Sequence, residues 1–257
     1  MIPASVLFLI PNFEVLSAIG IILAGGAGTR LYPLTKDKPK ALVEISGKTL
    51  LERCLEKIIK AGCKRIVINA HHFSDLIEQY LEKQSYPVEI YLSKEEELLD
   101  TGGGLKNAKK YFSLKENILI HNVDIISQID ILSMQDKLNN SNSLAILAVS
   151  KRLSSRQLLF NENNLLSGWQ NTQTNQEIIT RKKENLTPLA FSGVHIIRPE
   201  ILHLMPNENK FSIINHYLEL SKNNDLLAFK HENLLWYDLG KYEQIAEIEQ
   251  QITQNYI

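Results

Sequence analysis

The sequence of 257 residues contains only two cysteines, few aromatic residues (7%) and almost no net charge (−1). Cys54 and Cys63 lack the spacing of a metal site and cannot form a disulfide framework, so we predict two reduced core thiols. A net charge near zero gives no basic face for nucleic acid. With 44% hydrophobic and 22% charged residues, the composition is that of an ordinary soluble globular protein. The chain is long enough for one large core, or for one core and a small lobe.

A long hydrophobic run is also missing. The apolar run from Val6 to Ile10 is interrupted by Pro3, Pro11 and Glu14, which makes it too short and too polar to span a bilayer. It also lacks the cationic start and the cleavage site of a signal peptide. We interpret residues 1–17 as an N-terminal extension of unknown role, with an exposed amphipathic tail as the alternative. We expect a cytoplasmic protein without a membrane partner.

The most informative stretch is a glycine-rich loop after an apolar run at residues 19–23. Glycines allow the backbone to turn tightly and to approach a ligand closely. Unpaired N–H groups beyond a buried strand attract anions, and Arg30 and Lys40 add two positive charges. The loop has neither the Walker pattern nor the dinucleotide pattern. It predicts a nucleoside triphosphate site, whereas the alternative, a plain strand-to-helix turn, requires neither cation. The predicted nucleotide-binding residues of this stretch are Leu23, Ala24, Gly25, Gly26, Gly28 and Thr29.

Strand and helix patterns alternate after this loop. Strands are expected at 65–69 and 88–92, and helices at 49–61 and 74–83. This alternation predicts an α/β fold, with a doubly wound and mostly parallel sheet flanked by helices. A hairpin near 158–169 and a polar loop at 171–185 indicate a small mixed β lobe. We therefore expect one domain over 18–257, divided into a nucleotide-binding half (18–150) and a sugar-phosphate half (151–257).

Polar residues and glycines follow several of the predicted strands. Asn69 ends one strand, Asp124 follows another at 117–121, and Gly102 to Gly104 are expected to open a helix at 105–111. Because ligands bind beyond the carboxyl ends of parallel strands, we expect these residues at one crevice. Two alternatives remain: Asp124 as a helix or turn cap, and the glycines as a helix start without a ligand. His195 alternates with apolar neighbours and is interpreted as a core histidine rather than a catalytic one.

The motifs together resemble a known family. The string G-G-x-G-T-R-L-x-P-L-T at 25–35, the string P-K-A-L at 39–42 and the string W-Y-D-L-G at 236–240 are similar to those of the sugar-1-phosphate nucleotidylyltransferases. The resemblance implies an enzyme that uses Mg²⁺, a nucleoside triphosphate and a sugar 1-phosphate. Val123 stands where the family has glycine, and the E-K-P motif of several hexose-1-phosphate enzymes is absent. The resemblance implies Arg30, Lys40 and Asp124 as catalytic residues, Asp124 and Asp238 as metal ligands, Asn69, Gly102 and Gly103 as further nucleotide contacts, and Ser192 and Gly193 as sugar contacts.

Two further strings narrow the choice of substrate within this family. The strings L-L-D-T-G-G-G-L at 98–105 and F-S-G-V at 191–194 look most similar to N-acetylmuramic acid 1-phosphate uridylyltransferases, which serve the cell wall. Mannose- or heptose-1-phosphate guanylyltransferases are the alternative enzymes. A regulatory protein that binds a sugar nucleotide without catalysis is the alternative function, although Arg30, Lys40, Asp124 and Asp238 are all present. We expect a monomer or a small homo-oligomer.

Overall fold

The computed structural model describes residues 18–26, 28, 31–232, 234–240 and 245–255. Its helices are α1 (Leu50–Lys60), α2 (Ser74–Glu82), α3 (Asp100–Asn107), α4 (Ile131–Asn139), α5 (Ile213–Leu220) and α6 (Ile245–Asn255), with 3₁₀ helices η2 (Lys40–Leu42), η3 (Ala108–Tyr111) and η4 (Pro199–His203). The strands are β1 (Ala18–Leu23), β2 (Glu44–Ile45), β3 (Lys48–Thr49), β4 (Arg65–Ala70), β5 (Glu89–Lys94), β6 (Asn117–Asn122), β7 (Ile125–Ser127), β8 (Ala145–Ser150), β9 (Arg156–Phe160), β10 (Leu166–Asn171), β11 (Gln176–Ile179), β12 (Thr187–Ile197), β13 (Leu226–Lys230) and β14 (Trp236–Asp238).

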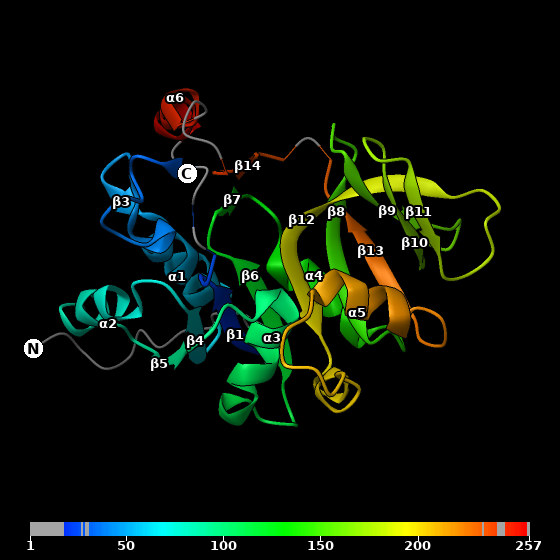
Figure 1. Cartoon of the computed structure of the whole chain (residues 1–257), viewed down its shortest axis with the longest axis horizontal. Helices are drawn as coiled ribbons and strands as arrows, with labels where there is room; N and C mark the ends of the chain where they lie inside the picture. Colours follow the sequence, from blue (N-terminus) through cyan, green and yellow to red (C-terminus); the bar gives the residue numbers. More distant parts are fainter. Residues whose placement is uncertain (1–17, 27, 29–30, 233, 241–244, 256–257) are drawn as a thin grey trace, which may run out of the picture.

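A ten-stranded sheet forms the centre of the molecule (Figure 1). Strands β6, β1, β4 and β5 lie side by side in parallel, and β13 runs parallel to β8. The long strand β12 is antiparallel to both β6 and β8, and β9, β10 and β11 extend the sheet in antiparallel order. The predicted α/β fold with a mostly parallel central sheet is confirmed. The sheet is continuous across residue 150, so the division into two halves stays a prediction.

Successive side chains of β1 point to opposite faces of the sheet, and both sets are buried. Ile22 packs with the side chains of α1 and α4 in one apolar cluster, whereas Ile19 and Ile21 pack with those of α3 and α5 in the other. Figure 1 shows α3 and α5 on the near side of the sheet. A buried strand flanked by helices on both faces is expected to be apolar at every position, as β1 is.

Close packing of α1 requires Gly20. A Cβ atom at this position would lie 2.6 Å from Ile58 Cγ2, so only glycine lets the helix approach the strand this closely. The helix begins where Thr49 Oγ1 accepts a hydrogen bond from the Glu52 N–H at 3.1 Å, which satisfies one otherwise free donor of the first turn. The start of α1 is thus set by the Thr49 cap, and its close approach to β1 depends on Gly20.

Two elements differ from expectation. Gly102 to Gly104 lie inside α3, which begins at Asp100. Side chains at these positions would overlap with Phe211, Asn209 and the Asn69–Glu95 pair, which explains why the helix contains three glycines. The stretch expected to be a polar loop contains β11, whose backbone pairs with β10 although its side chains are exposed or half-buried. Because an edge strand can be held by backbone hydrogen bonds with few buried side chains, its sequence need not show the alternation of apolar residues that predicts a strand.

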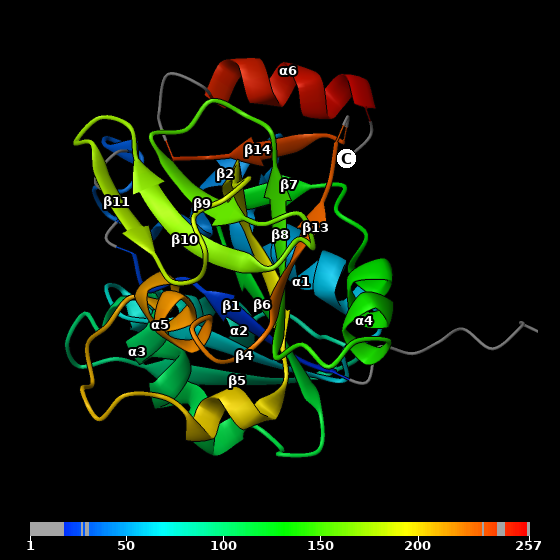
Figure 2. The same ribbon diagram turned by 90° about the vertical axis from the view of Figure 1, so that its right-hand side faces the viewer.

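The last strand and helix cross over the sheet. Strand β14 pairs with β7 in a separate two-stranded ribbon, and α6 lies above β14 at the top of Figure 2. Ser46 N donates a hydrogen bond to Glu249 Oε1 at 3.0 Å, which ties α6 to the turn between β2 and β3. No helix in the described part of the chain is long and apolar enough to cross a membrane.

Two histidines are buried in the core below the carboxyl ends of the strands. His121 and His195 are both fully buried, and the His195 ring lies 5.3 Å from the Phe191 ring and 5.5 Å from the Tyr217 ring. Within the described residues, neither ring nitrogen of His195 has a hydrogen-bond partner. Burial lowers the pKa of His121 to about 4 and that of His195 to about 3. The interpretation of His195 as a core histidine is confirmed.

These histidines predict that acid destabilises the fold. An unfolded histidine gains its proton near pH 6.5, whereas the folded one stays neutral until the pH approaches its lowered pKa. Each buried histidine therefore contributes stability that is complete above pH 6.5 and is lost as the pH falls towards 4 for His121 or 3 for His195. Between pH 7 and pH 5, His195 accounts for about 2 kcal/mol of the decrease in unfolding free energy.

We expect His195→Phe, which keeps an aromatic ring between its neighbours, to remove this part of the pH dependence. Urea unfolding at pH 7 and pH 5 measures the change. His203→Gln serves as the control, because His203 is exposed. An equal pH dependence in His195→Phe and wild type would contradict the assignment.

Candidate functional site

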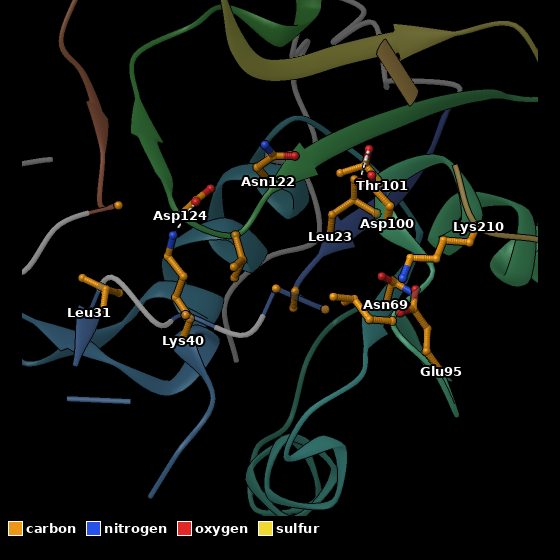
Figure 3. Close-up of a pocket in the computed structure, with 17 residues that line it drawn as sticks. Leu23, Leu31, Lys40, Asn69, Glu95, Asp100, Thr101, Asn122, Asp124 and Lys210 are labelled. Atoms are coloured by element: carbon orange, nitrogen blue, oxygen red, sulfur yellow. Dashed lines mark hydrogen bonds and ion pairs between the residues drawn. The ribbon is translucent and has the colours of Figure 1, made fainter. Parts of the chain in front are cut away.

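A cavity of about 440 Å³ opens at the carboxyl ends of β1, β4 and β6 (Figure 3). The last residue of β1, Leu23, lies opposite Asn69 of β4 on one side and Asn122 of β6 on the other. The cavity contains most of the predicted nucleotide-binding residues, but Thr29 and Arg30 lie outside the described residues. Its walls are formed by Leu23, Ala24, Gly25, Gly26, Gly28, Leu31, Lys40, Asn69, Glu95, Leu98, Asp100, Thr101, Asn122, Val123, Asp124, Lys210 and Gly240.

An ion pair joins Lys40 Nζ to Asp124 Oδ2 at one side of the cavity. Lys40 comes from η2 and is 8% exposed, and Asp124 lies between β6 and β7. A buried ammonium group needs a partner, because desolvation of an isolated charge costs several kcal/mol. The pair therefore keeps both charges at the cavity wall.

Gly28 connects the glycine loop to Lys40. Its φ is +64°, and a Cβ atom there would lie 3.2 Å from Lys40 Cβ and 3.0 Å from Thr35 Cγ2. Thr35 Oγ1 also donates a hydrogen bond to Gly28 O at 2.9 Å. Only glycine adopts this backbone conformation readily, so Gly28 sets how closely the loop approaches the lysine.

A second pair of polar side chains, Asn69 and Glu95, lies on the other side of the cavity in Figure 3. Both residues are buried, and Asn69 Nδ2 donates a hydrogen bond to Glu95 Oε1 at 2.9 Å. Glu95 Oε2 accepts a hydrogen bond from Leu99 N at 3.2 Å. Because a carboxylate only accepts hydrogen bonds, Asn69 must turn its NH₂ group towards Glu95. Its Oδ1 atom, for which the described residues provide no hydrogen bond, is the group left for a ligand.

The three glycines of α3 make close contacts within the protein. A Cβ atom would lie 2.3 Å from Phe211 Cε2 at Gly102, and 2.1 Å from Asn209 O at Gly103. At Gly104 it would lie 2.7 Å from Asn69 Oδ1 and from Glu95 Oε1. Gly102 and Gly103 are not among the residues that line the cavity, whereas their neighbours Asp100 and Thr101 are. The direct nucleotide contacts proposed for these two glycines stay predictions.

Strand β14 brings Asp238 beside Asp124. Asp238 pairs with Ile125 across the ribbon, and Leu239 N donates a hydrogen bond to Asp124 O at 2.9 Å. The side chain of Asp238 is exposed and is not among the residues that line the cavity, whereas Gly240, two positions later, is. The sequence places these two aspartates far apart, and the fold brings them onto neighbouring backbones.

Ser192 and Gly193 occupy an irregular part of β12. The pairing with β8 changes register between Phe191 and His195, and Gly193 has a φ of +74°. A Cβ atom at Gly193 would lie 3.1 Å from Asn122 Nδ2. Ser192 is fully buried, and its Oγ lies 2.7 Å from His231 Nε2. Both residues thus form the wall behind the cavity, and their proposed contacts with a sugar stay predictions.

Both cysteines are buried and free, as predicted. Cys54 Sγ lies 3.3 Å from His121 Nδ1 behind the site. Burial, and secondarily the charge of Asp124, raises the pKa of Cys54, and burial raises the pKa of Cys63 to about 12. Neither thiol is therefore a nucleophile at neutral pH.

Comparisons with known proteins agree with this geometry. A family model described as nucleotidyl transferase matches residues 19–157. N-acetylmuramate alpha-1-phosphate uridylyltransferase from Caulobacter vibrioides is 30% identical over 231 residues, which is 86% of this chain and 91% of that protein. The chain belongs to the nucleotidyl transferase family.

Within the nucleotidyl transferase family, the chain is a member of the sugar-1-phosphate nucleotidyltransferases, which are enzymes of nucleotide-sugar biosynthesis. Mannose-1-phosphate guanylyltransferase catalytic subunit beta from Drosophila melanogaster is 26% identical over 227 residues, and the chain covers 59% of that relative's length. The structure of the inositol-1-phosphate CTP transferase from T. maritima has the same fold, with a TM-score of 0.73 at 19% identity over 94% of this chain and 98% of that one.

Among the lining residues that were not predicted, two are charged and lie outside every motif quoted from the sequence, Glu95 and Lys210. Glu95 stands in a run of three glutamates, of which only Glu95 is buried, and the run looks like a solvated turn. Lys210 belongs to the segment that contacts the glycines of α3. Three consecutive glycines were the available signal that another segment approaches closely there.

This contact predicts that the glycines of α3 are required for stability. We expect Gly103→Ala to lower the melting temperature by an amount equivalent to about 1–3 kcal/mol, because a methyl group would overlap with the backbone oxygen of Asn209. Gly26→Ala is the matched control, since no atom lies within 4 Å of its would-be Cβ. Thermal melts of both variants measure the difference, and an unchanged melting temperature in Gly103→Ala would contradict the close contact.

Proposed function

We propose that this nucleotidyl transferase uses UTP and N-acetylmuramic acid 1-phosphate, and that it releases UDP-N-acetylmuramic acid and pyrophosphate. The arrangement of the cavity supports the proposal most directly, because the Lys40–Asp124 ion pair lies on one side and the Asn69 amide on the other. A cation suits the phosphates, and an amide suits the base. The Caulobacter vibrioides relative carries this activity in its name and is matched over 91% of its length.

The reaction needs a positioned triphosphate and an attacking oxyanion. An oxygen of the sugar phosphate attacks the α-phosphorus, the bond to the β-phosphate oxygen breaks, and pyrophosphate leaves with the bonding electrons. The sugar phosphate is mostly a dianion at neutral pH, because its second pKa is near 6, so no general base is required. Catalysis then depends on positioning and charge neutralisation. We assign the neutralising charge at the α-phosphate and the incoming phosphate to Lys40.

Asp124 and Asp238 fit a magnesium ion. The described residues contain no group of three or more histidine, cysteine, aspartate or glutamate side chains that could hold a metal. Mg²⁺ in nucleotide sites takes one or two carboxylates and completes its octahedral shell with phosphate oxygens and water. We therefore assign the ion to Asp124 in the cavity wall and to Asp238 on the adjacent backbone. The ion, when bound, would supply positive charge to the phosphates.

The fixed amide of Asn69 narrows the choice of base. Since Nδ2 is held by Glu95, we assign Oδ1 as the acceptor that Asn69, a lining residue of the cavity, offers to the base. Uracil, thymine and guanine each carry a ring N–H that donates to an acceptor, whereas the equivalent ring nitrogen of cytosine is itself an acceptor. The amide thus supports uridylyl transfer, disfavours CTP, and leaves guanylyl transfer to mannose or heptose 1-phosphate as the second candidate.

A neighbouring cavity is suited to the acceptor sugar. It has a volume of about 500 Å³ and shares Asp100 with the nucleotide cavity. Trp169 of β10 and Phe191 of β12 give it apolar surfaces, and Gln157 and Asn171 give it amides. This mixture suits a sugar ring, so we assign β9, β10 and β12 to the acceptor. With this acceptor the product is a cell-wall precursor, which we place in the cytoplasm.

Pyrophosphate release tests the proposal directly. UTP, GTP, CTP and dTTP are combined with the 1-phosphates of N-acetylmuramic acid, mannose, glucose and heptose in the presence of magnesium. We expect UTP with N-acetylmuramic acid 1-phosphate to be the fastest pair. In that assay Lys40→Ala should lower kcat by about 10²–10³, the cost of losing a preorganised charge.

Lys48→Ala is the control, because Lys48 also forms an ion pair, with Glu56 at 2.6 Å, but on the exposed surface. A most active pair that contains GTP would replace the uridylyl assignment. Nucleotide binding without turnover of any acceptor would favour the regulatory alternative. Full activity of Lys40→Ala would remove Lys40 from the reaction.

The hydrogen bond between Glu95 and Asn69 leads to a prediction about which nucleotide base the enzyme selects. Glutamine at position 95 both donates and accepts hydrogen bonds, so Asn69 is free to turn its NH₂ group into the cavity. We expect Glu95→Gln to shift the UTP-to-CTP ratio of kcat/KM towards CTP by roughly tenfold, in line with one hydrogen bond. Glu96→Gln, at the exposed neighbouring position, should leave the ratio unchanged. An unaltered ratio in Glu95→Gln would show that Asn69 does not select the base.

A further inference from the structure

A third cavity, of about 330 Å³, lies at the ends of β8 and β13. Strand β8 runs parallel to β6, since both are antiparallel to β12, and β13 runs parallel to β8. The carboxyl ends of β8 and β13 therefore face the same way as those that form the nucleotide cavity. The third cavity is lined by Ser150, Lys151, Arg152, His231, Glu232, Leu234 and Trp236.

We call this third cavity the basic cavity, because Lys151 and Arg152 line it. The irregular part of β12, between Phe191 and His195, separates it from the nucleotide cavity and the acceptor cavity. Phe191 lines the acceptor cavity, and its carbonyl oxygen accepts a hydrogen bond from Arg152 Nη2 at 2.6 Å. Gly193 packs against Asn122, which lines the nucleotide cavity. Trp236 Nε1 donates to Ser192 O at 2.9 Å from the side of the basic cavity. The basic cavity therefore adjoins the stretch of β12 whose residues contact or line the other two cavities.

Arg152 has more donors than the protein uses. Its guanidinium carbon lies over the Trp236 ring, 4.0 Å from the ring centre, as in a cation–π contact. Of its five N–H donors, the described residues accept a hydrogen bond only from Nη2, and Nε is buried without a partner. Burial lowers the pKa of Arg152, and the charge of Asp238 opposes this effect. Unused donors on a desolvated cation indicate a site for an oxyanion.

His231 supplies a second unused group. It is 4% exposed, its Nε2 lies 2.7 Å from Ser192 Oγ, and its Nδ1 is buried without a partner among the described residues. When Ser192 donates to Nε2, the proton of the neutral ring is on Nδ1. Lys151 adds a positive charge to the cavity, and the exposed Glu232 adds the negative charge there.

We propose that Arg152, assisted by His231 and Lys151, binds an oxyanion of the acceptor in this basic cavity and thereby selects acidic acceptors. The inference rests on the proposed function, which gives an acceptor with two such groups. One is the 1-phosphate, and the other is the lactyl carboxylate that distinguishes N-acetylmuramic acid from N-acetylglucosamine. Arg152 presents a planar set of donors that suits either group.

Two acceptor substrates distinguish binding of the carboxylate from binding of the phosphate. N-acetylmuramic acid 1-phosphate and N-acetylglucosamine 1-phosphate differ only by the lactyl substituent. We measure kcat/KM with UTP for wild type, Arg152→Met and Arg152→Ala, where methionine retains contact with the Trp236 ring. If the carboxylate is bound, kcat/KM for the muramic substrate falls by about 10–100-fold and the other is unchanged. If the phosphate is bound, both fall by this factor.

The control is Lys230→Ala, an exposed cation of β13 next to His231 that does not line the basic cavity. Unchanged kcat/KM for both acceptors in Arg152→Met would overturn the proposal. So would an increased magnesium requirement with an unaltered KM for the acceptor, because Arg152 would then act only as the counter-ion of Asp238.

A binding measurement separates this inference from the proposed function. Calorimetric titration with inorganic phosphate, without nucleotide or metal, compares wild type with Arg152→Met. If wild type does not use N-acetylmuramic acid 1-phosphate, the proposed function fails, but loss of a phosphate site in Arg152→Met still supports the basic cavity. Identical titrations of the two proteins in that case would overturn it.

Discussion

Three parallel strands end in register at one edge of the sheet, and the site depends on this register. Leu23, Asn69 and Asn122 lie opposite one another across β4, β1 and β6. The ends of the strands supply different parts of the cavity: the glycine loop follows β1, Asn69 lies at the end of β4, Glu95 follows the neighbouring strand β5, and Asp124 follows β6. A shift of one residue in any strand would turn its terminal side chain to the opposite face. The apolar packing on both faces thus also fixes the polar geometry of the cavity.

Those features of the site that depend only on neighbouring residues could be predicted from the sequence. The glycine loop, the alternation of strands and helices, and Asp124 after a strand are each contained within a few neighbouring residues, and the structure places Lys40, Asn69 and Asp124 around one cavity as expected. The W-Y-D-L-G string was predicted to contribute to the site, and β14 brings it beside Asp124. That prediction came from the family resemblance, because nothing local shows which distant residue a strand will meet.

Other features could not be predicted because they arise only from tertiary contacts. Gly102 and Gly103 are packed inside α3 against the segment around Phe211, more than a hundred positions later in the chain. Glu95 is indistinguishable in sequence from its two exposed neighbours, and its role follows from the hydrogen bond with Asn69. Arg152 follows a buried strand as a surface cation would, and only the fold brings it onto the Trp236 ring. In each case a residue acquires its environment from a partner distant in the chain.

The position of β14 has a consequence for local unfolding. Strand β14 pairs with β7 in a two-stranded ribbon outside the ten-stranded sheet, whereas β1, β4, β5 and β6 pair with one another inside it. Opening of the ribbon alone would take Asp238 away from Asp124 and leave the strands that form the nucleotide cavity paired. The second carboxylate assigned to the metal is thus subject to a local opening equilibrium that does not require unfolding of the sheet.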